Sequence, residues 1–485
     1  VALCGLSVAG IRFLTTMGLA SAAVVAVAVL VALTVVPALI GILGKRLLPR
    51  RRRTADDGAD AERRPASLWV RAVTRRPWVT IGAVVVLLGL CAVPASGLRL
   101  ALTDNGFADK GSQQRETYDA VAAAYGEGYN SPIVVIADVS QPSGSVAAVQ
   151  GLAQELSQLD GVEGVSLATP NEDGTLAFVQ IRPEKSQADP ATMELVRSIR
   201  SHADDYESRY GLTDLMVTGQ TAVAIDVAEE LNAALVPFGI VVVGLSLILL
   251  MVVFRSVAVP LTATLGYLLS LGAGMGAVGA VFGRGWAADL LAVSKVGAVI
   301  SFLPVIVMGV LFGLAMDYQV FLVSRMREEW SRRRGDATDA TPEARREAAA
   351  VAVETGFQGS AKVVVAAAVI MIGVFMAFVH TDNVYVKPIA LGLTVGIAAD
   401  AFLVRMTLIP ALMAALGEKA WWLPAWLDRL LPVVDVEGEG LEQALEQEEA
   451  AAGQSARPVM DSSGDEAEDA EGAADPEDRQ AAVVS

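Results

Sequence analysis

Long apolar stretches, separated by shorter polar segments, dominate the pattern of this chain. A helix needs about 20 apolar residues to cross a bilayer core, and soluble domains rarely contain stretches of that length. The pattern predicts seven membrane spans, at residues 17–43, 78–97, 232–254, 258–282, 303–324, 362–380 and 386–414. The chain is therefore predicted to be a polytopic α-helical membrane protein.

The long polar segment 98–231 has a different pattern. Alternating apolar and polar residues rich in Val and Ile indicate strands, and two longer segments have the composition of helices. The expected elements are strand 131–138, helix 143–158, strands 161–168 and 173–182, helix 190–209 and strand 213–219. The order βαββαβ is that of the ferredoxin-like motif. We therefore expect an α+β porter domain between two spans.

Positive charge predicts the orientation of the spans. Segment 45–76 contains eleven Lys and Arg residues, and loop 325–361 contains seven Arg residues. Because Lys and Arg accumulate in cytoplasmic loops, both segments are placed inside and the porter domain is extracytoplasmic. Beside a span this topogenic role is favoured over binding of nucleic acid. The expected location is the plasma membrane.

The chain's charge is concentrated at its C-terminal end. The net charge is −17, but residues 435–485 alone contain sixteen Asp and Glu against two Lys and Arg. Such a composition cannot bury enough apolar surface to fold, so an acidic disordered tail is expected at 433–485. The other expected parts are a first-half remnant at 1–44, a basic linker at 45–77, a span at 78–97, the domain at 98–231 and a five-helix bundle at 232–432.

An internal repeat indicates two related halves. The segment Leu33–Gly44, LTVVPALIGILG, matches Met406–Gly417, MTLIPALMAALG, at an offset of 373 residues. Repeated halves are common in transporters. Segment 1–44 is interpreted as the end of a first half, whose remainder would be supplied by upstream sequence or by a second chain.

A single carboxylate interrupts span 303–324. Asp317 follows Gly309 and Gly313 at intervals of four residues, so the three residues share one face of a helix. Small residues allow a neighbouring helix to approach closely, and an intramembrane charge is costly and typical of ion pathways. Asp317 is therefore predicted to carry protons at a helix interface. Tyr318 is predicted to contact an aspartate on the partner helix, although simple packing is nearly as well supported.

The last span repeats this arrangement. Asp400 lies on one face with Gly392 and Gly396, and Arg405 follows five residues later. A structural ion pair between Asp400 and Arg405 is favoured over direct proton carriage. The glycines are expected to serve helix packing.

Other classes of chemistry lack support in the sequence. The chain has two Cys and two His residues without metal-ligand spacing, and it contains no nucleotide-binding glycine motif. No metal, cofactor or enzymatic activity is therefore predicted.

Three segments resemble the mycobacterial-membrane-protein-large (MMPL) family of the resistance–nodulation–division superfamily. They are GLAMDYQVFLVSRMREEW (313–330), TGQTAVAIDVAEEL (218–231) and the segment 398–432, which begins AADAFLVRMTLIPALM. The resemblance implies twelve spans, two porter domains and proton-driven export of lipids or other hydrophobic compounds. It also implies a proton relay through one Asp–Tyr pair in each half, matched here by Asp317 and Tyr318.

The leading hypothesis is therefore a lipid or efflux exporter driven by the proton-motive force, with protons, membrane lipids and a hydrophobic substrate as partners. Two alternatives remain at this point: a non-transporting, sterol-sensing-like lipid-binding scaffold, and a proton-driven helper of protein export. All three hypotheses are compatible with an oligomer.

Overall fold

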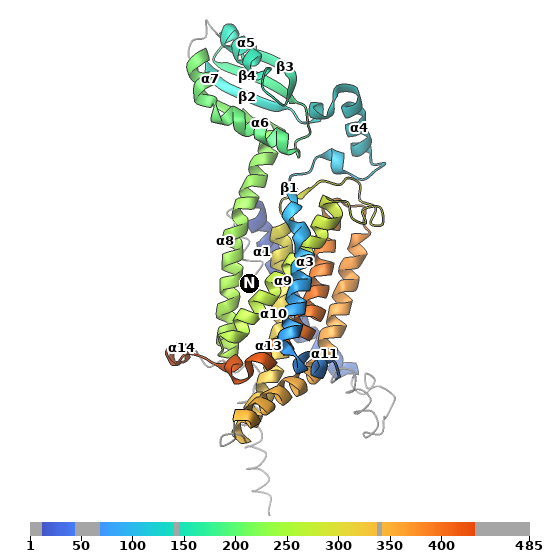
Figure 1. Ribbon diagram of the computed structural model, residues 1–485. Helices are drawn as coiled ribbons and strands as arrows, with labels where there is room; N and C mark the ends of the chain where they lie inside the picture. Colours follow the sequence, from blue (N-terminus) through green and yellow to red (C-terminus); the bar gives the residue numbers. More distant parts are fainter. Residues whose placement is uncertain (1–11, 44–67, 140–144, 337–341, 432–485) are drawn as a thin grey trace, which may run out of the picture. The chain divides into compact units, whose positions relative to one another are not determined.

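The computed structural model describes residues 12–43, 68–139, 145–336 and 342–431, which all belong to the unit Val1–Pro432 (Figure 1). For some residues in these ranges, including Asp317 and Tyr318, only the backbone is described. The predicted acidic tail and most of the predicted basic linker lie outside the described residues.

Seven described helical segments are long and apolar enough to cross a membrane, which confirms the predicted polytopic helical fold. The spans lie within 15–43, 77–97, 220–254, 258–283, 303–331, 360–379 and 386–421. The helices that supply them are α1 (Arg12–Leu43), α3 (Pro77–Ala92), α8 (Gln220–Phe254), α9 (Ala258–Val278), α10 (Leu303–Asp336), α11 (Pro342–Val379), α12 (Val386–Ala398) and α13 (Ile409–Leu416).

Three of these spans form the interior of the bundle. The windows on α9, α10 and the α12–α13 span are 61%, 56% and 67% buried, whereas the window on α1 is 0% buried. The helices α9, α10 and α12 pack against one another, with α3, α8 and α11 around them. Apolar side chains from all six of these helices share one core. Asp400 and Arg405 of the last span are buried in this interior.

The last span is not a regular α-helix throughout. A π-helical segment, Ala399–Leu408, joins α12 to α13. A shorter π-helical turn, Gly279–Gly283, follows α9. Such segments are rare and are frequently found at functional sites.

The βαββαβ domain has the predicted topology. It consists of β2 (Ile133–Val139), α5 (Ser145–Leu156), β3 (Val162–Pro170), β4 (Leu176–Pro183), α6 (Pro190–Ser201), α7 (Ala203–Tyr210) and β5 (Leu212–Thr218). The sheet order is β3-β4-β2-β5, with antiparallel pairing throughout. Alternate residues of β2 and β4 are buried against α5 and α6. The helix predicted at 190–209 is broken at His202, whose backbone (φ −106°, ψ 14°) leaves the helical conformation.

A second small structure lies at one end of the bundle. Strand β1 (Arg99–Ala101), which follows α3, pairs in parallel with β6 (Ala298–Ile300), which precedes α10. Helix α4 (Gln113–Tyr125) follows β1 and leads to β2 (Figure 1). Helix α8 begins directly after β5 and continues through its span for 35 residues, about 52 Å. The domain and the bundle are thus joined by one continuous helix.

One prediction needs correction. The predicted loop 325–361 is largely helical, because α10 continues to Asp336 and α11 begins at Pro342. Met326 and Phe357 are fully buried, and a Cβ on Gly356 would lie 2.8 Å from the Cα of Met326. The apolar contact between α10 and α11 therefore continues beyond the predicted spans. The many Arg residues of this segment had led to the prediction of a loop.

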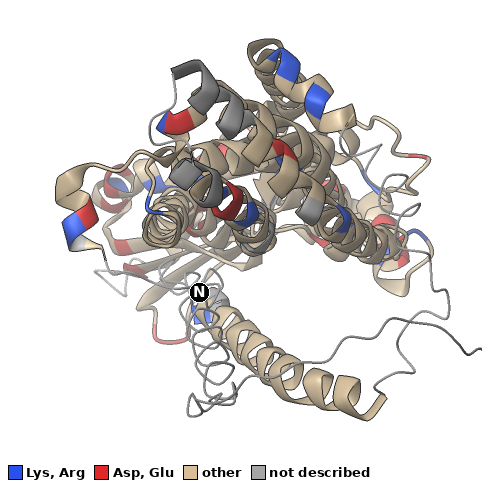
Figure 2. Ribbon diagram, turned by 90° about the horizontal axis from the view of Figure 1, so that it is seen from below, with Lys and Arg blue, Asp and Glu red and all other residues tan. Residues whose placement is uncertain are grey.

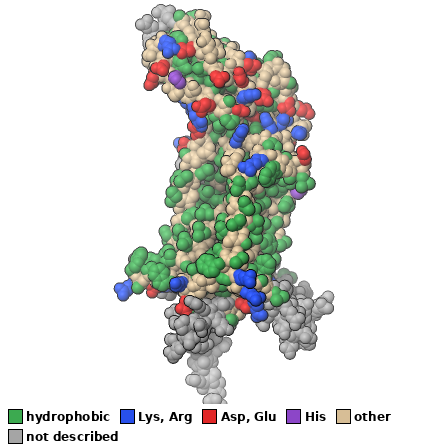
Figure 3. All heavy atoms as spheres, viewed as in Figure 1, with side chains coloured by type: hydrophobic (Ala, Val, Ile, Leu, Met, Phe, Trp, Pro, Cys, Tyr) green, Lys and Arg blue, Asp and Glu red, His purple; other side chains and the backbone are tan. Residues whose placement is uncertain are grey.

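The distribution of side chains fits a membrane protein. Hydrophobic side chains cover the middle of the bundle, and charged side chains gather toward its ends and on the βαββαβ domain (Figure 3). In the view from below, most of the helical ribbon carries uncharged residues, and the charged residues are scattered over short stretches (Figure 2).

Candidate intramembrane charge site

The π-helical segment of the last span brings two charges together. Asp400 and Arg405 are 4% and 3% exposed, and Nε of Arg405 lies 2.5 Å from Oδ2 of Asp400. In an α-helix, residues five apart would point about 140° away from each other. A π-helix bonds residue i to residue i+5, so such residues lie nearly above one another. The ion pair is thus a direct consequence of the local backbone.

One backbone bond and one side-chain bond, each over five residues, mark this segment. The N–H of Ile409 donates to the carbonyl of Val404, five residues earlier, and the hydroxyl of Thr407 donates to the carbonyl of Phe402 over 2.9 Å. Pro410 follows immediately and has no N–H to offer the preceding turn. The hydrogen-bonding pattern between residues five apart therefore ends next to a proline.

Arg405 reaches beyond Asp400 to helix α10. Its Nη1 donates to Oε1 of Gln319 over 3.4 Å, and its Nη2 donates to the carbonyl of Ala315. On the other side, the hydroxyl of Ser270 on α9 lies 3.4 Å from Oδ1 of Asp400. One buried ion pair therefore links the three innermost helices. Because buried charges are stable only when their hydrogen bonds are satisfied, the guanidinium fixes these helices relative to one another.

The predicted proton-relay residues lie beside this cluster in the chain. Asp317 and Tyr318 fall between Ala315 and Gln319 on α10, but their side chains lie outside the described ones. The roles of both residues therefore stay predictions. Their surroundings along the chain are defined, because Arg405 bonds to the residues two positions before and two positions after Asp317.

The glycines predicted for packing occupy different surroundings. Gly392 and Gly396 face α9: a Cβ on Gly274 would lie 2.5 Å from the carbonyl oxygen of Gly392 and 3.3 Å from the Cα of Gly396. On α10, a Cβ on Gly309 would meet Phe238 of α8 at 3.6 Å, whereas one on Gly313 would meet no described atom within 4 Å. Backbone approach is thus close on α12 and absent around Gly313 in the described part of the chain.

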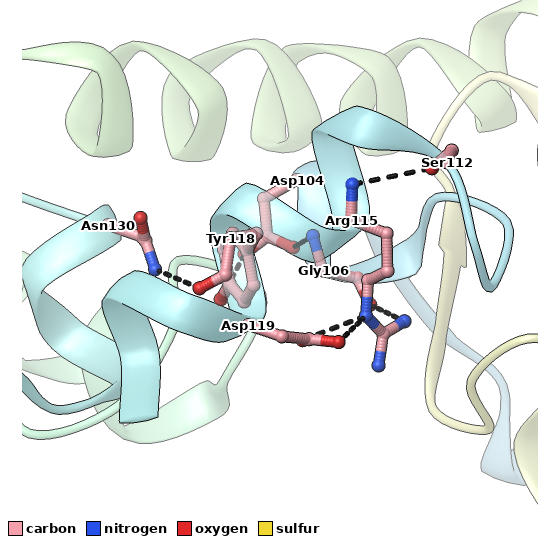
Figure 4. A network of polar contacts seen from close by, with 7 residues as sticks. All are labelled: Asp104, Gly106, Ser112, Arg115, Tyr118, Asp119 and Asn130. Atoms are coloured by element: carbon pink, nitrogen blue, oxygen red, sulfur yellow. Dashed lines mark hydrogen bonds and ion pairs between the residues drawn. The ribbon is translucent and has the colours of Figure 1, made fainter. Parts of the chain in front are cut away.

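A second polar cluster lies outside the spans, around Asp104 (Figure 4). Its carboxylate accepts the N–H of Gly106 over 2.9 Å and the hydroxyl of Tyr118 over 3.2 Å. Burial raises the pKa of Asp104, and the nearby Lys295 ammonium opposes that rise. Burial, together with the Asp104 carboxylate, raises the pKa of Tyr118. The cluster stabilises the connection between β1 and α4.

No metal centre is formed by the residues that the structure describes. They contain no group of three or more His, Cys, Asp or Glu side chains that would hold an ion.

The sequence profile of the MMPL family matches residues 1–80 and 108–432. The chain belongs to the MMPL family. It is accordingly a multi-pass membrane protein.

Named relatives support this assignment. The chain is 38% identical to the membrane protein YdfJ of Bacillus subtilis, over 92% of this chain and 59% of that protein. It is 32% identical to the mycolic acid-containing lipids exporter MmpL11 of Mycolicibacterium smegmatis, over 90% of this chain and 46% of the relative. It is 30% identical to the heme uptake protein MmpL11 of Mycobacterium tuberculosis H37Rv, over 88% of this chain and 44% of that protein. This MMPL chain thus spans about half the length of the curated relatives it matches.

Sequence reasoning missed two members of the intramembrane cluster. Gln319 is 2% exposed and Ser270 is fully buried, yet neither carries a charge that would mark it in an apolar span. The position of Gln319, two residues after Asp317, was an available signal. Ser270 was recognisable only after α9 had been placed against the last span.

Proposed function

We propose that this MMPL chain is part of an exporter of lipids or other hydrophobic compounds, driven by the proton-motive force. Membership of the family and the lipid exporter among the relatives support this class of cargo. Another relative is named a heme uptake protein, so the named relatives differ in the substance they transport and in the direction of transport. A hydrophobic cargo is common to both.

We propose that Asp317 and Tyr318 relay the protons. The observation that carries the proposal is the position of Arg405, whose guanidinium bonds to Ala315 and Gln319 on both sides of Asp317 along α10. A ligand shifts a conformational equilibrium only when it interacts differently with the two states. A proton on Asp317 changes the charge balance in the same helical turn that Arg405 holds. Loading and release of that proton would therefore favour different arrangements of α10 and the last span.

Buried polar groups beyond the ion pair favour a transporter over a passive scaffold. The Asp400–Arg405 pair by itself holds helices together and would serve either role. Here the buried polar groups extend further, to Nε2 of Gln319 and the hydroxyls of Thr264 and Thr394, which have no partner among the described residues. Buried polar groups are normally hydrogen-bonded, so these are candidates for contact with water or with further helices.

We propose that further spans cover α1 and the Gly313 face of α10. Their source would be another part of the same protein or a second chain. The window of α1 is 0% buried, and the position of a Cβ on Gly313 is open. These two features suit helices that the described residues do not include.

The test is Asp317→Asn in the full-length protein, with Tyr318→Phe for comparison. Asparagine keeps the side-chain volume but cannot ionise, so proton-gradient-dependent efflux from reconstituted vesicles should fall to background. Tyr318→Phe removes one hydroxyl and no charge, so it should reduce efflux less. Gel filtration in detergent checks that both variants fold.

Normal efflux by the folded Asn variant would rule out Asp317 as the proton carrier. Lipid binding without any gradient-dependent transport in the wild-type protein would favour the scaffold alternative. Gradient-dependent stimulation of protein secretion would favour the protein-export helper.

A further inference from the structure

A short helical segment, residues 68–75, packs against the bundle just before α3. Val70 is fully buried and joins the apolar core of the bundle, and Val73 is 5% exposed. The indole N–H of Trp69, although its ring is 51% exposed, donates to the carbonyl of Met406 over 3.0 Å. This bond connects residues 337 positions apart and ends inside the π-helical segment.

The acceptor carbonyl has no local donor in the α-helical register. In the α-helical register that begins at Ile409, the carbonyl of Met406 would accept from residue 410. That residue is Pro410, which has no N–H. Within a membrane protein a backbone carbonyl without a donor is unfavourable, so a donor from elsewhere stabilises the turn. Trp69 supplies that donor.

The same short helix is attached on its other side. Nε of Arg71 donates to Oε1 of Glu354 on α11 over 2.6 Å, and Nε2 of Gln358 reaches the same oxygen at 3.3 Å. The segment 68–75 therefore connects α11 to the turn that contains Arg405.

We propose that Trp69 is a positioning residue for the intramembrane charge site. By satisfying the carbonyl of Met406, its indole N–H fixes the wide turn that directs Arg405 toward Asp400 and α10. The proposal rests on the proposed proton-coupled function. It assigns to the indole N–H a role that the aromatic ring alone cannot perform.

The experiment separates the N–H from the ring. Trp69→Phe keeps an aromatic ring and removes the donor, and Pro410→Ala returns a local donor to the carbonyl of Met406. The exposed Trp78, 71% exposed, provides the matched control Trp78→Phe. All variants, and the double variant Trp69→Phe with Pro410→Ala, are made in the full-length protein. Each is assayed for thermal unfolding in detergent and for the pH profile and substrate KM of efflux.

Trp69→Phe is expected to lower the maximal efflux rate about fivefold, as loss of one hydrogen bond would. The pH midpoint of efflux should shift, because Arg405 is the charge held beside Asp400 and the turn that contains Asp317. Substrate KM should stay unchanged, since a positioning role acts on the charge site and not on cargo binding. The double variant should recover both rate and midpoint, and Trp78→Phe should match the wild type.

A wild-type pH profile in Trp69→Phe overturns the proposal. So does a defect that Pro410→Ala fails to rescue, since that result assigns the effect to the ring. The proposal is also overturned if the double variant recovers thermal stability while no variant changes the pH profile, because the hydrogen bond would then have a structural role alone. The indole N–H of Trp69, followed by ¹⁵N–¹H NMR, reports the hydrogen bond even if Asp317→Asn shows that the proposed proton relay is wrong.

Discussion

The βαββαβ domain and the membrane bundle place their ion pairs in opposite environments. In the domain, Arg197 pairs with Glu229 and Arg200 with Asp226, and all four side chains are between 36% and 53% exposed. The domain core itself is made of apolar side chains. In the bundle, the side chains of Arg405 and Asp400 are 3% and 5% exposed, at the meeting point of three helices.

The difference is energetic. Exposed pairs contribute about 0–1 kcal/mol, because water competes with them and the long side chains lose entropy. A buried pair contributes little net stability, but removal of one partner leaves an uncompensated charge. The domain's pairs between α6 and α8 should therefore contribute little stability, whereas the bundle's pair constrains how the helices fit together. Substitutions in the two regions should accordingly differ widely in their effects.

Loss of one partner of the buried pair should be severe. Asp400→Leu should lower the free energy of unfolding by about 3–5 kcal/mol, because Arg405 stays buried without its carboxylate. The double variant Asp400→Leu with Arg405→Met should recover most of that loss, while gradient-dependent transport stays absent. Unfolding in detergent, measured as a double-mutant cycle, provides the numbers. A loss in the double variant equal to the sum of the losses in Asp400→Leu and Arg405→Met would show that the two residues are not energetically coupled.

Glycine packing should be asymmetric along the bundle. In Gly274→Ala the new Cβ would lie 2.5 Å from a backbone oxygen of α12, which has to shift. The expected cost is about 1–3 kcal/mol, the usual range for overpacking. Gly313→Ala is the matched control, because its Cβ meets no described atom within 4 Å. A larger loss in the control than in Gly274→Ala would place another helix against Gly313 in the isolated chain.

The cluster around Asp104 should make its segment sensitive to pH. Because burial raises the pKa of Asp104, folding favours its protonated form. Its stabilising contribution is complete below the ordinary Asp value of about 3.9 and is lost as pH rises through the raised pKa. Asp104→Asn keeps an acceptor for Gly106 but cannot titrate. It should therefore flatten the pH dependence.

The measurement is hydrogen exchange of the amides of residues 104–118 between pH 4 and pH 7. Asp119→Asn serves as the control, because that carboxylate is 54% exposed and pairs with Arg115 at the surface. An unchanged pH slope in Asp104→Asn would assign the dependence to another group.

The smallest effect is expected from the domain's surface pairs. Arg197→Ala removes two hydrogen bonds to Glu229, yet it should change the free energy of unfolding by no more than about 1 kcal/mol. Raised salt should shrink the effect further, because exposed pairs are screened. A loss as large as that of Asp400→Leu would erase the contrast between the two regions.

The membrane spans and the βαββαβ order could be predicted from the sequence. Both depend on local periodicity: long apolar stretches satisfy the bilayer, and alternating residues define the strands of a half-buried sheet. The sequence also marked Asp400 and Arg405, because a charge in an apolar span is conspicuous. It failed at loop 325–361, where frequent Arg residues concealed the helical spacing of Met326 and Phe357.

The contacts between the buried charges depend on how the helices pack. On an α-helix, two residues five positions apart do not face each other. The π-helical segment brings Asp400 and Arg405 together. Trp69, 337 residues before Met406 in the chain, stabilises that segment. Likewise Ser270 and Gln319 are uncharged and locally unremarkable, and they become part of the site through contact with Asp400 and Arg405. Periodicity is a property of neighbours in the chain, whereas a buried charge is satisfied by whichever groups the packed helices bring within reach.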